Sequence, residues 1–242
     1  MITRLISICL TFSLISCLSS PEPVDAGKSK SFLRQGTKYF YVGDDHGLPS
    51  VKNELRNVNG ELQILSRMIA ADHNKIYYKY NPQPVADRRS FVADKSIYRD
   101  KNHVYRLSQF TLDIIPAADP SSFRYLASDE GGQVIWAVDK QRYFLWHRPV
   151  ATDYATFKIL NNHLAFDSLS IYLATPGGLQ TVGSCDGKIE KITAGFCRDK
   201  SSVYFYSAKK GFTKIPVSGL SRILVIRDEE ISIDKKIFNI NH

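Results

Sequence analysis

A short motif that recurs along most of the chain limits the folds open to it. The motif starts with an aspartate, continues with polar residues and ends in two hydrophobic residues, as in Asp100-Lys-Asn-His-Val-Tyr105. Successive copies are 28, 39, 28, 32 and 35 residues apart, and their aspartates are Asp72, Asp100, Asp139, Asp167, Asp199 and Asp234. A unit this small cannot bury its apolar face alone, so neighbouring units must stack on one another.

The aspartate of each copy is predicted to be a structural turn residue. Its side chain can accept hydrogen bonds from backbone N–H groups two residues on, which favours it as the first residue of a type I turn. The hydrophobic pair then resumes a strand. At the position of His103 the other copies carry Lys75, Arg142, Ser170 and Ser202. A catalytic group would not vary in this way, so His103 is interpreted as a solvated turn residue.

A second motif lies between the aspartate copies. Ala118-Asp-Pro-Ser-Ser-Phe123 is matched by residues 152–157 and 86–91, and a decayed copy begins at Ser218. Asp119 is expected to cap a short helical turn with Pro120 at its first position. Phe123 would then fold back onto the core. Each unit is therefore predicted to hold two or three short strands and one turn of helix.

Together the two motifs resemble the bacterial DKNYY family, over roughly residues 70–240. That family has no assigned activity, so the resemblance implies an architecture and no mechanism. We predict an all-β fold of stacked antiparallel β-hairpin repeats of about 28–39 residues. An irregular β-propeller is the alternative, because these units are shorter than the roughly 40–45 residues of a four-stranded blade.

The N-terminus carries the features of a bacterial lipoprotein signal. Arg4 precedes a charge-free apolar stretch, residues 5–15, which is shorter than the roughly 20 residues that span a bilayer and suits a secretory signal. Leu14-Ile-Ser-Cys17 resembles the lipobox, which implies cleavage before Cys17 and lipid attachment to its sulfur. Leu18, where retained lipoproteins have Asp, favours the outer membrane by analogy with Gram-negative sorting.

These features divide the chain into three parts. Residues 1–16 are predicted to be the signal peptide, and residues 17–37 the lipidated cysteine and a flexible tether rich in Ser, Pro, Gly and Lys. Residues 38–242 would form the β-repeat domain. In an oxidising compartment Cys185 and Cys197 are expected to form a disulfide, since Asp186-Gly187 is a hairpin-turn signal between them.

The chain has a net charge of +8, but its Lys and Arg residues are scattered without a basic run. This pattern argues against nucleic acid and is consistent with plain solubility, or with attraction to anionic headgroups or envelope glycans. Seven tyrosines in the predicted strands could stack on sugars or anchor a protein partner, but half-buried strand packing is favoured for each: Tyr77, Tyr78, Tyr105, Tyr143, Tyr172, Tyr204 and Tyr206.

Two stretches match chemical sites only in part. Gly183-Ser-Cys185-Asp-Gly187 fits the cysteine form of a nucleophile elbow, yet the single histidine after it is His242. Asp44, Asp45 and His46 could contact a metal, but one tripeptide seldom supplies convergent ligands. We therefore expect no metal, no cofactor and no catalysis.

The sequence predicts a non-enzymatic lipoprotein of the bacterial cell envelope. Its β-repeat domain would bind or organise another component, and the membrane would be reached through the N-terminal lipid. An envelope protein or a glycan is the expected partner. The alternatives are an envelope hydrolase with an unrecognised active site and a structural subunit of an envelope complex.

Overall fold

The computed structural model describes residues 20–43, 51–94, 97–126 and 135–241. Two compact units divide the chain, Met1–Arg89 and Ser90–His242. Within the described residues there is no helix, and every pair of neighbouring strands is antiparallel. No helix of this part of the chain has the length and apolar character needed to cross a membrane. The predicted all-β class is confirmed.

The first unit contains two four-stranded sheets. Sheet A consists of β1 (Glu22–Asp25), β2 (Ser29–Gln35), β3 (Lys38–Gly43) and β4 (Val51–Glu54). Sheet B consists of β5 (Gln63–Ile64), β6 (Ile69–Ala71), β7 (Ile76–Tyr78) and β8 (Asn81–Pro82).

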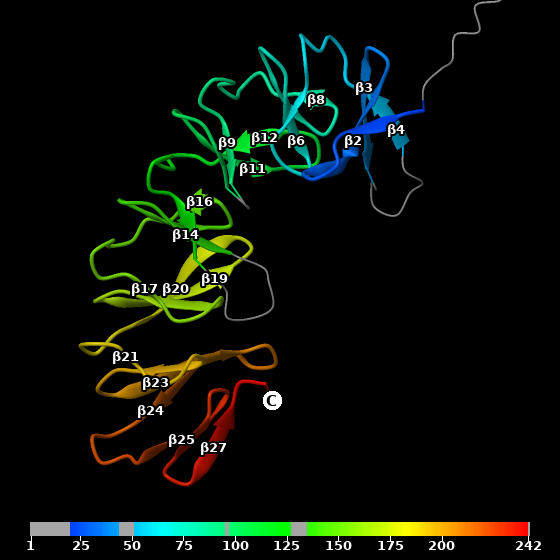
Figure 1. Cartoon of the computed structure of the whole chain (residues 1–242). Helices are drawn as coiled ribbons and strands as arrows, with labels where there is room; N and C mark the ends of the chain where they lie inside the picture. The colour runs from blue at the N-terminus through cyan, green and yellow to red at the C-terminus, as the bar shows by residue number, and fades with distance from the viewer. Residues whose placement is uncertain (1–19, 44–50, 95–96, 127–134, 242) are drawn as a thin grey trace, which may run out of the picture. The chain divides into compact units, whose positions relative to one another are not determined.

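Five more sheets follow in the second unit, in chain order from the green β9 to the red β27 (Figure 1). Sheet C has β9 (Val92–Asp94), β10 (Ile97–Arg99), β11 (Val104–Leu107) and β12 (Leu112–Ile114). Sheet D has β13 (Arg124–Tyr125), β14 (Trp136–Val138), β15 (Tyr143–Leu145) and β16 (Arg148–Pro149). Sheet E has β17 (Lys158–Ile159), β18 (Leu164–Phe166), β19 (Ser170–Thr175) and β20 (Gly178–Ser184). Sheet F has β21 (Glu190–Lys191), β22 (Phe196–Arg198), β23 (Ser202–Ser207) and β24 (Gly211–Pro216). Sheet G has β25 (Ile223–Arg227), β26 (Glu230–Ile233) and β27 (Lys236–Asn239).

Each sheet is a meander in which every strand pairs with the next one along the chain. The aspartate motif forms the turn between the two central strands of a sheet, as Asp100 does between β10 and β11. Four strands fit into so short a repeat because the outer ones are as short as two residues, as in β13 and β17. The repeat therefore has more strands than the two or three predicted.

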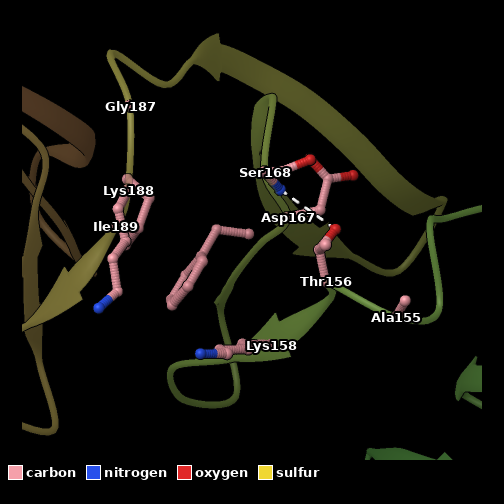
Figure 2. Close-up of a pocket in the computed structure, with 9 residues that line it drawn as sticks. Ala155, Thr156, Lys158, Asp167, Ser168, Gly187, Lys188 and Ile189 are labelled. Atoms are coloured by element: carbon pink, nitrogen blue, oxygen red, sulfur yellow. Dashed lines mark hydrogen bonds between the residues drawn. The ribbon is translucent and has the colours of Figure 1, made fainter.

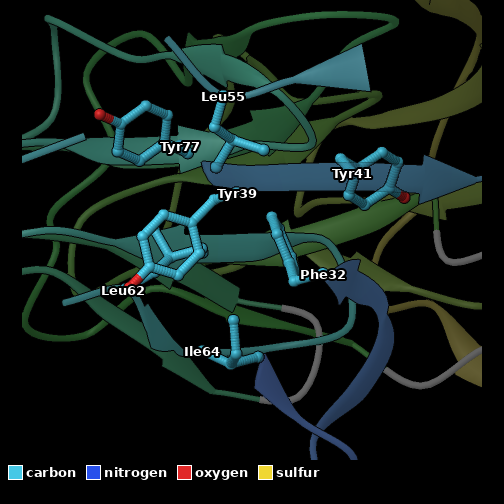
Figure 3. Close-up of a cluster of buried hydrophobic side chains, with 8 residues drawn as sticks. Phe32, Tyr39, Tyr41, Leu55, Leu62, Ile64 and Tyr77 are labelled. Atoms are coloured by element: carbon cyan, nitrogen blue, oxygen red, sulfur yellow. The ribbon is translucent and has the colours of Figure 1, made fainter. Parts of the chain in front are cut away.

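The hydrophobic core is divided into clusters that each lie between two successive sheets. In the first unit, Phe32, Tyr39 and Tyr41 of sheet A pack with Ile64 and Tyr77 of sheet B (Figure 3). In the second unit the clusters join sheets C and D, D and E, E and F, and F and G. Stability thus comes from contacts between neighbours, as in other stacked repeats.

The motif fixes which face of the sheet each residue covers. Tyr204, five residues after Asp199, joins the cluster shared with the preceding sheet E. Val203 and Phe205, four and six residues after it, join the cluster shared with the following sheet G. The copies in sheets D and E follow the same rule, because side chains alternate between faces along a strand.

One boundary predicted from the sequence is wrong. Part of the segment interpreted as a flexible tether, residues 17–37, forms β1 and β2 of sheet A. Phe32 is fully buried in the cluster with sheet B. Phe32 follows the polar stretch Lys28-Ser-Lys-Ser31, whose composition is typical of a flexible segment and hid the strand.

Candidate functional site

Five of the six motif aspartates are buried, with only 1–7% of their surface exposed: Asp72, Asp100, Asp139, Asp167 and Asp199. In each, Oδ1 accepts hydrogen bonds from the backbone N–H groups two and three residues further on, at 2.7–2.9 Å. For Asp100 the donors are Asn102 and His103. These carboxylates therefore hold the turn together rather than face solvent.

The second carboxylate oxygen ties the turn to the neighbouring strand and to the chain before it. The tyrosine hydroxyl five residues on donates to Oδ2 in four copies, at 2.8 Å from Tyr77, 2.5 Å from Tyr105, 2.5 Å from Tyr172 and 2.6 Å from Tyr204. In the Asp139 copy the corresponding residue is Phe144. There Oδ2 accepts the backbone N–H of Asp119, at 3.0 Å.

The contact from Asp119 shows that the two sequence motifs are halves of one structural module. Ser122 Oγ also accepts the N–H of Lys140, the residue after Asp139, at 3.1 Å. The equivalent bonds run from Lys101 to Ser90 and from Ser168 to Thr156. The second motif forms a single turn closed by Phe123 N–H and Asp119 C=O, and not a helix, while Phe123 is buried as predicted.

The hydrogen bonds shift the pKa values of both partners away from neutrality. Burial raises the pKa of Asp72, Asp167 and Asp199. The N–H and tyrosine donors together lower that pKa by more than burial raises it, so the net pKa lies below 3.8. Burial and the adjacent carboxylate raise the pKa of the tyrosines above 10.0: Tyr77, Tyr172 and Tyr204. At neutral pH these groups hold fixed protonation states.

Two motif residues differ from their expected environment. Asp234 is exposed, and its Oδ1 accepts the backbone N–H of Arg222 at 2.8 Å. Asp234 and Lys235 both have positive φ, 48° and 72°, so this shortened copy makes a two-residue hairpin turn. His103 is half-buried rather than solvated, and its Nδ1 has no hydrogen-bond partner within the described residues.

The predicted disulfide is absent from the described structure, where Cys185 and Cys197 are free thiols. Asp186-Gly187 does not join two strands of a hairpin but connects sheet E to sheet F. Cys185 Sγ lies 3.7 Å from the Asp167 carbonyl, whereas Cys197 pairs across sheet F with Lys191 and Tyr204. Cys185 follows β20 of sheet E and Cys197 lies on β22 of sheet F. Both side chains contact the hydrophobic cluster between these two sheets, without a bond between their sulfurs.

Several predicted sites fall outside the described residues. The signal peptide, Cys17 and the Asp44, Asp45 and His46 tripeptide all lie there. Within the described ranges, no group of three or more His, Cys, Asp or Glu side chains is placed to hold a metal ion.

A cavity of about 450 Å³ lies between sheets E and F (Figure 2). Its wall includes Thr156, Asp167 and Ser168, and two exposed lysines, Lys158 and Lys188. Asp167 is already occupied by the turn bonds described above, and Thr156 Oγ1 accepts the N–H of Ser168. The lysines are mobile, hydrated charges, so the cavity has no preorganised chemical group.

Two further cavities, of about 350 and 330 Å³, share Trp146 and Pro176 in their walls. Arg148, Tyr172 and Thr181 line the first, and His163 and Tyr206 line the second. The rings of His163 and Tyr206 stack at 4.3 Å. We call the surface formed by both cavities the Trp146 groove.

The backbone at the Trp146 groove is strained. Trp146 and His147 form the two-residue turn between β15 and β16, with φ values of 50° and 64°. Such turns favour Asn-Gly, and bulky residues in this region cost of order 1–3 kcal/mol each. His147 Nε2 is hydrogen-bonded to the Tyr125 hydroxyl at 3.1 Å, and burial together with Arg106 lowers the pKa of His147. Strain of this kind concentrates at functional surfaces.

Comparison with known proteins matches the chain to the DKNYY family over residues 71–208, more than half of its 242 residues. The chain belongs to the DKNYY family. No curated protein and no solved structure is detectably similar to it. The family assignment confirms the resemblance drawn from the repeats and adds no activity. We call the aspartate motif together with the second motif that is hydrogen-bonded to it, as in Asp139 with Asp119, the DKNYY module.

Sequence reasoning did not identify the Trp146 groove. Its walls come from sheets D, E and F, so no local spacing connects them. One signal was available, because Trp146 is one of only two tryptophans in the chain and stands beside a histidine at a turn.

Removing the hydroxyl of Tyr204 is expected to destabilise the protein. Tyr204→Phe leaves one lone pair of the buried Asp199 carboxylate without its donor, which should lower the free energy of unfolding by about 1–3 kcal/mol. Urea denaturation followed by tyrosine and tryptophan fluorescence measures this change. Phe144→Tyr is the matched control, since it adds a hydroxyl at the copy that lacks one and should not destabilise. An unchanged midpoint for Tyr204→Phe would contradict the role assigned to the hydroxyl.

Stability of the DKNYY modules should depend on pH at both extremes. The lowered aspartate pKa values contribute stability above pH 3.8 that is lost as pH falls through the folded pKa values. The raised tyrosine pKa values contribute stability below pH 10.0 that is lost as pH rises beyond it. Melting temperature should change little between about pH 7 and pH 9, because the lowered pKa of His147 affects stability only below pH 6.5 and the raised pKa values of Cys185 and Cys197 only above pH 9.0. A steep change inside that window would be inconsistent with this network.

Proposed function

We propose that the chain is a non-catalytic binding or scaffolding protein of the bacterial cell envelope, held at the membrane by a lipid on Cys17. The DKNYY module carries this proposal, because its repeated ionisable groups are used to build the fold. Each buried aspartate of the module has its carboxylate occupied by backbone N–H groups, and in four copies by a tyrosine as well. Acids and phenols with pKa values moved away from neutrality are poor general acids and bases.

The cysteines support the same proposal against a hydrolase. Burial and the charges of Asp199 and Asp167 raise the pKa of Cys185 to about 11. Burial, Cys185 and Asp199 raise the pKa of Cys197 to about 12. A cysteine nucleophile acts as the thiolate, and both thiols stay protonated at neutral pH.

The Trp146 groove is the surface best suited to a ligand. It combines aromatic rings with a few polar groups, among them Arg148, Thr175 and Thr181. Ligand sites commonly pair an apolar or aromatic wall with a small number of polar groups that fix orientation. A glycan of the envelope fits this chemistry, because a sugar ring presents an apolar face to an aromatic ring and hydroxyls at its edge.

Replacing Trp146 should weaken glycan binding without unfolding the chain. Trp146→Ala removes the ring shared by both cavities, and binding to a glycan array or to isolated envelope polysaccharide should fall by at least about tenfold. Phe110→Ala, which changes an aromatic residue of 40% exposure in the turn between β11 and β12, is the control. Circular dichroism checks the fold of both variants. Equal binding by both would remove the groove from the proposal.

The lipid anchor is tested separately. Cys17→Ala removes the sulfur to which the diacylglyceryl group would be attached, so metabolic labelling with a fatty acid should be lost and the protein should leave the membrane fraction. Cys197→Ala should keep both the label and the membrane location. Persistent labelling of Cys17→Ala would refute the anchor and leave the glycan-binding proposal standing.

A further inference from the structure

The two faces of sheet G have different surroundings. Ile231 and Ile233 pack against Phe196, Val203 and Phe205 of sheet F. By strand register Leu224 pairs with Ser232, and Ser232 with Ile237, so these three residues occupy the opposite face. We call this opposite face the outer face of sheet G.

The outer face is apolar and exposed. Leu224 is 47% exposed and Ile237 is 62% exposed, while Ser232 between them is only 9% exposed. Ile226, in the bulge of the same strand, is 49% exposed, and Leu220 just before that strand is 96% exposed. Val225, which pairs with Ile231 and so lies on the face toward sheet F, is 55% exposed at this edge of the sheet. Exposed large hydrophobic residues gathered on one small sheet indicate an interaction surface, since single scattered ones are the norm.

The short turn at Asp234 explains why Leu224 and Ile237 face away from sheet F. In sheet F the residue three before the aspartate, Phe196, faces the following sheet. In sheet G the residue three before Asp234, Ile231, faces the preceding sheet F instead. The two-residue turn thus reverses the faces relative to the longer DKNYY turns, and it directs Leu224 and Ile237 away from the core.

The face of sheet A opposite its cluster with sheet B is covered by polar side chains. Phe40 pairs with Leu33 and Glu54, on the face opposite Tyr39 and Tyr41. Lys52 Nζ lies 3.8 Å from the centre of the Phe40 ring and donates to Gln35. A second lysine, Lys38, forms an ion pair with Glu54 at 3.2 Å. Charged and polar side chains therefore lie over this face of sheet A, whereas the exposed Leu224 and Ile237 lie on the outer face of sheet G.

The charges around the outer face of sheet G suit a second copy of the same chain. Arg222, Lys235 and Lys236 lie at one end of the strands, where Asp234 offsets one of them. Asp228, Glu229 and Glu230 lie at the other end, where Arg227 pairs with Glu230 at 3.3 Å. One end therefore has an excess of positive charge and the other an equal excess of negative charge.

We propose that two copies of the chain associate through the outer faces of their sheets G. A twofold axis in the interface, perpendicular to the strands, sets the apolar centre of one copy on that of the other. The same axis places the Asp228 end of each copy against the Lys235 end of its partner, so both ends are complementary. This self-association does not depend on the glycan-binding proposal.

Sedimentation velocity over a range of concentrations tests the association, using the full chain with Cys17→Ala so that no lipid is attached. The protein should form dimers at the higher concentrations, and Ile237→Lys or Leu224→Lys should weaken the dimer by at least about tenfold. Leu169→Lys, at a 74% exposed leucine of sheet E's central turn, should leave it unchanged. A monomer at every concentration, or equal dimerisation of Ile237→Lys, would overturn the proposal.

Charge reversal tests the identity of the occupant and its orientation. Asp228→Lys with Glu229→Lys should weaken the dimer, because each altered end then meets the basic end of the partner. Adding Lys235→Glu with Lys236→Glu in the same chain should restore it. Recovery is expected only when copies pack end to opposite end, and failure of the four substitutions to restore the dimer contradicts this arrangement.

Discussion

The buried carboxylate of the DKNYY turn is the interaction on which the rest of the structure depends. A carboxylate out of water is costly unless its oxygens are hydrogen-bonded. In the Asp199 copy the donors are two backbone N–H groups of the turn, the Tyr204 hydroxyl and the N–H of Asp186. These bonds join three stretches of chain at one point. The bonds fix the length of the turn, and the turn length fixes the register of the two strands that it joins. The register in turn decides which side chains face the preceding sheet and which face the following one.

The sequence predicted this much because the interaction is largely local. Spacing of the aspartates shows a repeat, and the residues that follow show a turn and a strand. The tyrosine hydroxyl and the second motif were not recognised as partners of the carboxylate, since their contacts depend on three-dimensional packing. Strands such as Arg124–Tyr125 are too short to show a period, and Phe32 was concealed in a polar stretch. Fold class was therefore predictable, while strand number and the domain boundary were not.

Candidate sites were harder to predict because they form between repeats. The hairpin expected between Cys185 and Cys197 is a connection between sheets E and F, and the two thiols are free although both side chains contact one cluster. Trp146 and Tyr206 are far apart in sequence, yet they line one cavity. In a stacked repeat, neighbouring sheets bring such residues together. A motif within one repeat predicts its turn, whereas the cavities of the Trp146 groove form where turns and strands of successive repeats meet.

The Asp139 copy shows which parts of the DKNYY module are needed to form the turn and to pack the sheet, because it lacks the tyrosine hydroxyl. Phe144 replaces the tyrosine there, yet Asp139 is still buried and still accepts the N–H groups of Gln141, Arg142 and Asp119. The ring itself keeps its place against Phe123, at 5.3 Å between centroids. Backbone donors are therefore sufficient to form the turn, and the aromatic ring is sufficient to pack against its sheet's neighbours. The tyrosine hydroxyl adds the bond between them, which links the stability of the turn to the stacking of the sheets.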